Sequence, residues 1–291
     1  MMRFLFLTVF LLLPFFANGQ SEHKQQIDSA IIQKVEDSIE PDKVLHAEPL
    51  YIDLIRDLGA RKGENEWNFG MGLTDFDSFD EYEFLVEYEF AVIDRLGLEI
   101  EIPVFFYNSG SEGSRPDNRI ESLKTAIQWT FLVDQDISTS LALGYINELL
   151  FYPINQIGDN GLIEGNLFNP FFVGAKRWGD NFHTLIYTGP RFEYHFELSE
   201  WHIEYEMHLN FHYMIPGTTN FVGLEYNQYF GGTEYNQYSE GTEYHGVLRP
   251  QIRLDINENL LLGIVTGIPL DKTEERLSFF MRLIYEPEFW E

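Results

Sequence analysis

The chain has 291 residues, of which 16% are aromatic and none is cysteine, and it carries a formal net charge of −28. The lack of cysteine excludes disulfides and thiolate metal sites, and 19 basic residues against 47 acidic ones exclude nucleic acid as a partner. A hydrophobic content of 44% is too high for a disordered acidic chain, so charged and apolar residues must be segregated.

The first twenty residues have the pattern of an export signal. Arg3 provides a positive start, residues 4–16 are an unbroken apolar stretch, and Ala17-Asn18-Gly19 offers small residues for cleavage. We therefore expect residues 1–19 to form a signal peptide. No later stretch approaches the roughly 20 consecutive apolar residues that a membrane helix needs, so any membrane residence of the remaining chain predicts a β-barrel.

Residues 20–65 form a separate N-terminal segment that begins with a polar stretch. Apolar residues between positions 27 and 39 fall near helical spacing, with acids and amides between them. This pattern predicts a short, weakly amphipathic helix or an irregular arm. Two placements are open from the sequence: a periplasmic extension, or a plug tucked into the barrel.

An octapeptide, His-Ala-Glu-Pro-Leu-Tyr-Ile-Asp at positions 46–53, follows within this segment. It resembles the HAEPLYID family, which takes its name from these eight letters. The resemblance covers the octapeptide and the order export signal, octapeptide, β-rich body, and it implies kinship with exported proteins of Bacteroidota-type bacteria but no activity. From the residues alone, Pro49 keeps its predecessor extended, while the apolar residues that follow anchor the chain where it enters the barrel. The motif residues are His46, Glu48, Pro49, Tyr51 and Asp53, and a functional role for His46 and Glu48 stays open.

From position 66 the hydrophobic period changes to two. In the clearest stretch, 202–213, Ile203, Tyr205 and Leu209 alternate with histidine, glutamate and asparagine. One face of each strand is therefore apolar and the other polar, mostly acidic. We predict strands at 66–74, 82–92, 96–106, 120–133, 137–147, 167–178, 182–197, 201–214, 220–230, 244–256, 259–268 and 276–286.

Two features favour a membrane barrel over a soluble sandwich. The strands reach about ten to thirteen residues, which is long for globular sheets and right for a tilted membrane crossing. Links after even-numbered strands are short, whereas those at 107–119 and 148–166 are long, as in outer-membrane barrels; the short link at 198–200 departs from this rule. We therefore predict an all-β fold, a closed antiparallel transmembrane β-barrel of about 12 strands spanning 66–291, with 10 to 14 strands open.

The charged face of the strands must line the lumen, because a charge on the lipid face costs about 2–4 kcal/mol near the midplane. The expected acidic lining is Glu83, Glu87, Glu89, Glu99, Glu101, Glu193, Glu197, Glu204 and Glu206, with Glu225 beside them. The expected basic lining is Lys124, Arg191, Arg249, Arg253, Arg276 and Arg282. Because the predicted strands 82–92, 96–106 and 201–214 carry mostly acid, whereas 244–256 and 276–286 carry arginine, we expect opposed walls of unlike charge. They would either hold a field across a pore or close into ion pairs.

Histidine and glutamate on two consecutive predicted strands are candidate metal ligands. They are His195, His202, His208, Glu204 and Glu206. Residues two apart share a face but lie about 6.5–7 Å apart, so a site needs ligands from both strands at matching height. Lining the mouth of an acidic pore is the competing interpretation.

The sequence predicts a protein of the bacterial outer membrane that is not an enzyme. The first function hypothesis is a narrow channel for small solutes or cations, and the second is a non-conducting structural or ligand-binding barrel with a salt-bridged interior. An outer-membrane hydrolase ranks third, because Ser109, Ser111 and Ser114 have no nearby histidine and no nucleophile elbow, P-loop or dinucleotide fingerprint occurs. No catalytic residue and no cofactor is expected.

The sequence near the C-terminus indicates the remaining partners. Alternating apolar residues at 277–285, followed by Phe289-Trp290, resemble the signal that the outer-membrane insertion machinery recognises, so this machinery and membrane lipid are expected partners.

The sequence at 225–229 recurs at 234–238, which predicts a hairpin extension in an extracellular loop or an aromatic lip for a planar ligand.

Overall fold

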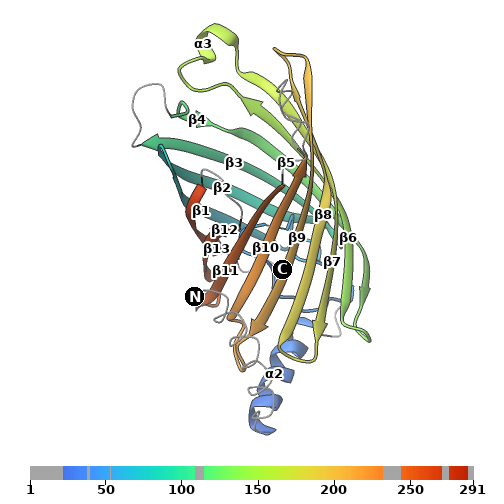
Figure 1. Ribbon diagram of the computed structural model, residues 1–291. Helices are drawn as coiled ribbons and strands as arrows, with labels where there is room; N and C mark the ends of the chain where they lie inside the picture. Colours follow the sequence, from blue (N-terminus) through green and yellow to red (C-terminus); the bar gives the residue numbers. More distant parts are fainter. Residues whose placement is uncertain are drawn as a thin grey trace.

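A computed structural model describes residues 22–37, 40–52, 54–108, 115–231, 244–270 and 275–287. The predicted signal peptide, the three loop serines, the second copy of the tyrosine repeat and Phe289-Trp290 lie outside these residues, as does Asp53. The described chain forms a closed antiparallel β-barrel (Figure 1).

The barrel wall follows the chain order. The elements are α2 (Glu22–Val35), β1 (Asn65–Phe76), β2 (Asp80–Ile93), β3 (Leu96–Asn108), β4 (Arg119–Ile120), β5 (Ser122–Asp134), β6 (Thr139–Phe151), α3 (Ile157–Asn160), β7 (Ile163–Trp178), β8 (Phe182–His195), β9 (Glu200–Met214), β10 (Phe221–Gly231), β11 (Tyr244–Asn257), β12 (Leu260–Pro269) and β13 (Glu275–Tyr285). β4 and β5 are two parts of one barrel strand, which is interrupted at Glu121. The thirteen strands therefore make twelve barrel strands within the described residues. The predicted strands differ from these bounds by at most four residues, and α3 was not predicted.

Closure comes from pairing of the first and last strands. Phe69 of β1 lies opposite Leu283 of β13, and β2 pairs with β3 on the other side. The wall therefore has no free first or last strand. This confirms the predicted closed antiparallel barrel of about 12 strands.

The two ends of the barrel differ. The links 94–95, 135–138, 179–181 and 258–259 gather at one end, here called the short-turn end, and α2 lies beyond it (Figure 1). Residues 115–118 and the link 152–162, which carries α3, lie at the opposite long-loop end. No helix among the described residues is long and apolar enough to cross a membrane.

The outward face of the wall is an exposed apolar belt. On β9, Ile203, Leu209 and Phe211 are 52%, 41% and 46% exposed, while the alternate residues 206, 208, 210 and 212 are buried inside. The same alternation runs along β1, where Phe69 and Met71 are exposed. No second layer covers this belt in the described chain.

Residues 43–60 except Asp53, here called the plug segment, run inside the barrel. Leu54, Ile55 and Leu58 pack against inward residues of β5 to β8, including Val173 and Leu185. Ala47 and Leu50 pack on the opposite side against inward residues of β2, β9, β10, β12 and β13. The inner face of the barrel's short-turn half is therefore partly apolar, because it packs against the plug segment and is not a solvated wall.

The wall also satisfies the backbone of the plug segment, which forms no regular structure of its own. The amide of Ala47 donates to Nδ1 of His183 (3.0 Å) and that of Leu50 to Oε1 of Gln251 (2.8 Å). Further along, the amide of Ile52 donates to Oε1 of Glu225 (3.1 Å). Buried amides without such partners would be costly, so these side chains replace a sheet neighbour.

Candidate lumen site

The octapeptide meets the wall through its first and middle side chains. Nε2 of His46 hydrogen-bonds Oγ of Ser140 (2.9 Å), and burial lowers the pKa of His46 to about 3, so its imidazole is neutral. The Arg249 guanidinium lies 3.4 Å from the centre of the Tyr51 ring, a cation–π contact in a buried setting. Pro49 is buried, and burial raises the pKa of Glu48 well above its usual value.

Arg56 carries the main positive charge of the plug segment. Its guanidinium pairs with Glu66, stands 3.7 Å from Oε2 of Glu89 and 3.3 Å from Oδ1 of Asp57. Its φ of 120° lies in a region that non-glycine residues rarely adopt, and the surrounding ion pairs hold it there. Burial acts to raise the pKa of Asp57, but Arg56 and Lys43 hold this pKa well below its usual value.

Four of the predicted lumen acids gather on the β2–β3 hairpin. Its tight turn sets a register in which Glu89 faces Glu99 and Glu87 faces Glu101. Nζ of Lys124 lies 3.0 Å from Glu99 and 3.3 Å from Glu101, both carboxylates being buried.

The side-chain amide of Asn68 on β1 contacts this cluster of acids. Nδ2 of Asn68 lies 2.8 to 2.9 Å from carboxylate oxygens of Glu66, Glu87 and Glu89. Nη1 of Arg282 stands 3.8 Å from Glu87. The lumen thus holds a dense acidic network where the plug segment crosses the wall.

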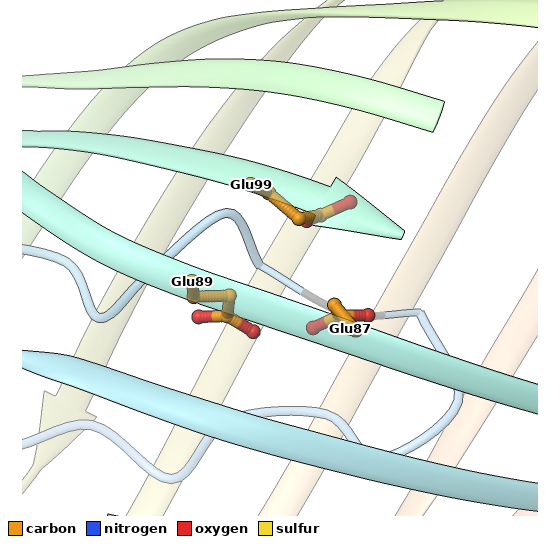
Figure 2. A group of neighbouring side chains, drawn as sticks. All are labelled: Glu87, Glu89 and Glu99. Atoms are coloured by element: carbon orange, nitrogen blue, oxygen red, sulfur yellow. The ribbon is translucent and has the colours of Figure 1, made fainter. Parts of the chain in front are cut away.

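The predicted histidine–glutamate set does not converge on one ion. Each imidazole pairs with a nearby acid on its own strand: His195 with Glu193 (2.9 Å), His202 with Glu204 (3.2 Å) and His208 with Glu206 (3.3 Å). Six residues separate His202 from His208, which is about 20 Å along a strand. Among the described residues, the acids that do converge are Glu87, Glu89 and Glu99, whose ligand oxygens lie within 4.8 Å of one another (Figure 2).

The predicted basic residues do not form a wall opposed to the acids. Closure puts β13 beside β1, so Arg282 reaches the acids of its own side. Arg249 bonds Asn227 (2.7 Å) and Ser278 (3.1 Å), and Arg253 donates to the carbonyl of Thr219 (2.8 Å).

Four further predicted residues lie nearer the long-loop end. Arg191 is 3.9 Å from Glu206, and the exposed Arg276 pairs with Asp75 at the rim (2.5 Å). Glu197 lies in the exposed turn between β8 and β9, because β8 ends at His195, and Glu83 is half-buried on β2.

A cavity of about 890 Å³ lies at the short-turn end between α2, the plug segment and the ends of β11 and β12. Lys34, Lys43, Glu48, Arg253 and Glu286 are among its lining residues, so both signs of charge meet there. The cavity leads to the plug segment from the side of α2.

Comparison with known proteins now bears on this architecture. The family model described as HAEPLYID-like matches residues 42–286, which include the octapeptide and all twelve barrel strands described. The chain belongs to the HAEPLYID-like family. No curated protein matches its sequence.

Solved structures share the fold of this HAEPLYID-like chain at low identity. An outer membrane channel from Pseudomonas putida F1 is 12% identical with a TM-score of 0.62, covering 79% of this chain and 98% of its own. The NanC porin is 8% identical with a TM-score of 0.53, covering 76% of this chain and 100% of its own. At such identities the likeness establishes the barrel fold.

Three residues of the lumen site were not predicted from the sequence of this HAEPLYID-like chain. Glu66 and Asn68 alternate with the outward Trp67 and Phe69, so the period-two signal that identified the other acids also applies to them. Arg56 lies in an irregular segment, where no period indicates which way a side chain points.

Proposed function

We propose that this protein is an outer-membrane channel for small solutes or cations whose lumen is closed, in the conformation described, by the plug segment. The observation that carries the proposal is the position of residues 43–60, which pack against both sides of the inner wall. The proposal involves no catalytic step.

The exposed apolar belt supports the membrane part of the proposal. A face this apolar on every side is stable in lipid and is a liability in water. It implies membrane lipid and the insertion machinery as partners and the bacterial outer membrane as the location. The fold shared with the Pseudomonas putida channel agrees with this assignment.

The plug segment supports a channel that opens by displacement of an internal element. Many of its fixing contacts are polar and reversible, such as Leu50 to Gln251 and Arg56 to Glu66. Once displaced, it would leave a lumen lined by the acids of β2, β3 and β9, which favours cations over anions. The same packing also fits the second candidate, a barrel whose interior never conducts.

A reversible lock distinguishes the two functions. A Cβ at Gly263 would lie 3.4 Å from Cγ of Leu50, so the pair Leu50→Cys and Gly263→Cys suits a disulfide between the plug segment and β12. The chain has no other cysteine, so oxidation acts at this pair alone. In planar bilayers we expect cation-selective openings from the parent protein, none from the oxidised variant, and their return on reduction.

The reduced double variant is the matched control for the loss of the leucine side chain. A parent protein that stays silent while heat-modifiable gel migration shows it folded would overturn the channel and leave the non-conducting barrel. Openings that persist in the locked variant would show that the plug segment is not the gate. A preference for anions would contradict the role given to the lumen acids.

A further inference from the structure

We propose that Glu87, Glu89 and Glu99, here called the carboxylate trio, form a binding site for a calcium ion between the barrel wall and the plug segment. Their ligand oxygens lie within 4.8 Å of one another, and all three side chains are at most 2% exposed. Figure 2 shows Glu87 and Glu89 on one strand and Glu99 on its neighbour. The site stands whether or not the barrel conducts.

The protein groups around the trio do not satisfy it. Oε2 of Glu87 is buried and has no hydrogen-bond partner, although its side chain is 0% exposed. Asn68 offers one amide nitrogen, with two hydrogens, to three carboxylates, and its own buried Oδ1 has no partner. A buried carboxylate oxygen without a partner is costly, so these atoms indicate a missing positive ligand.

The charge balance points the same way. Five buried carboxylates form the network: Glu66, Glu87, Glu89, Glu99 and Glu101. Three cations contact them: Arg56, Lys124 and Arg282. Five negative against three positive charges leaves two negative charges, and Arg56 is further shared with Asp57. One divalent cation restores neutrality in the low-dielectric interior.

Ligand chemistry selects the ion. The trio offers only oxygen, which hard cations prefer, and carboxylates can bind through one or both oxygens. Ca²⁺ accepts about six to eight oxygens in flexible geometry, whereas Mg²⁺ demands a near-ideal octahedron. Carboxylates that are held on two fixed strands therefore fit Ca²⁺ better than Mg²⁺. Asn68 is placed to supply a further oxygen if its amide turns over.

The site also touches the plug segment. Arg56 stands 3.7 Å from Glu89, so a bound ion and the guanidinium share one carboxylate. Calcium would thus fix the position of Glu89 at this contact and leave Glu66 and Asp57 as the other partners of Arg56.

Calorimetric titration of CaCl₂ into the full-length folded barrel in detergent at pH 7.5 tests the site. We expect saturable binding of one ion per chain, stronger than that of MgCl₂. Glu87→Gln and, separately, Glu99→Gln should weaken it roughly tenfold or more, the range found when groups that support a metal are removed. Glu204→Gln is the matched control, since it removes a lumen acid on β9 far from the trio.

A second measurement covers variants whose binding heat is small. Calcium should raise the unfolding temperature of the parent and of Glu204→Gln, and leave that of Glu87→Gln unchanged, with heat-modifiable migration confirming that each is folded. Absence of saturable binding to the parent would overturn the site. An equal calcium response in Glu87→Gln would place the ion elsewhere, and stabilisation by acid but not by calcium would show that protons neutralise the trio.

Discussion

His46 is the residue whose ionisation most directly opposes docking of the plug segment. Docked, it bonds Ser140, and burial, with smaller contributions from the neighbouring His183 and Arg177, lowers its pKa to about 3. Exposed, an imidazole has a pKa of about 6.5. Because the docked pKa is the lower one, docking is strongest above pH 6.5 and weakens as the pH falls toward 3. At pH 4.5, two units below 6.5, the loss is at most about 3 kcal/mol.

Hydrogen exchange of the backbone amides in 44–52, corrected for intrinsic rates, measures this docking. We expect protection to fall between pH 7.5 and 4.5 in the parent protein. His46→Gln keeps a hydrogen-bonding group near Ser140 and does not titrate, so its protection should fall less. Equal pH dependence in the two proteins would assign the effect to another group, such as His183.

At the scale of elements, close approach of the plug segment to β3 depends on one glycine. A Cβ at Gly97 would overlap the carbonyl oxygen of Ile55 and lie 2.7 Å from Cβ of Arg56. Gly97→Ala should therefore weaken docking by about 1–3 kcal/mol, the usual cost of overpacking. Trypsin cleavage after Arg56 should become about five- to 150-fold faster while the barrel stays folded. Gly174→Ala, whose Cβ would meet its nearest atom at 3.3 Å, is the control.

The wall could be predicted from the sequence because its determinants are local. Period-two alternation fixes both the strands and their faces, and β9 shows it over its whole length. The β2–β3 register was also within reach, since the predicted three-residue link at 93–95 places Glu89 opposite Glu99, the register that the β-bulge between Ala91 and Ile93 produces. The metal candidates came from two consecutive strands, but His202 and His208 are six positions apart on one of them, which is about 20 Å along a strand.

The plug segment could not be located because its partners are remote in sequence. His46 bonds a residue 94 positions away, and the amide of Leu50 one 201 positions away. One signal was nevertheless present: Phe171, Val173 and Ala175 make the inward face of β7 apolar. In a barrel with a lipid-facing apolar belt, a strand that is apolar on both faces indicates that something covers it from within.

At the scale of the whole molecule, the membrane assignment rests on what surrounds the outward belt. Leu209, near the middle of β9, is 41% exposed and packs against no second layer of the described chain. If lipid surrounds it, Leu209→Arg should destabilise the barrel by about 2–4 kcal/mol in reversible urea unfolding from vesicles. In a water-soluble protein, arginine at such a site would change the stability by only about 0.5 kcal/mol. Leu209→Ala separates loss of the side chain from the charge, and an arginine variant as stable as the alanine variant would mean that the belt faces water.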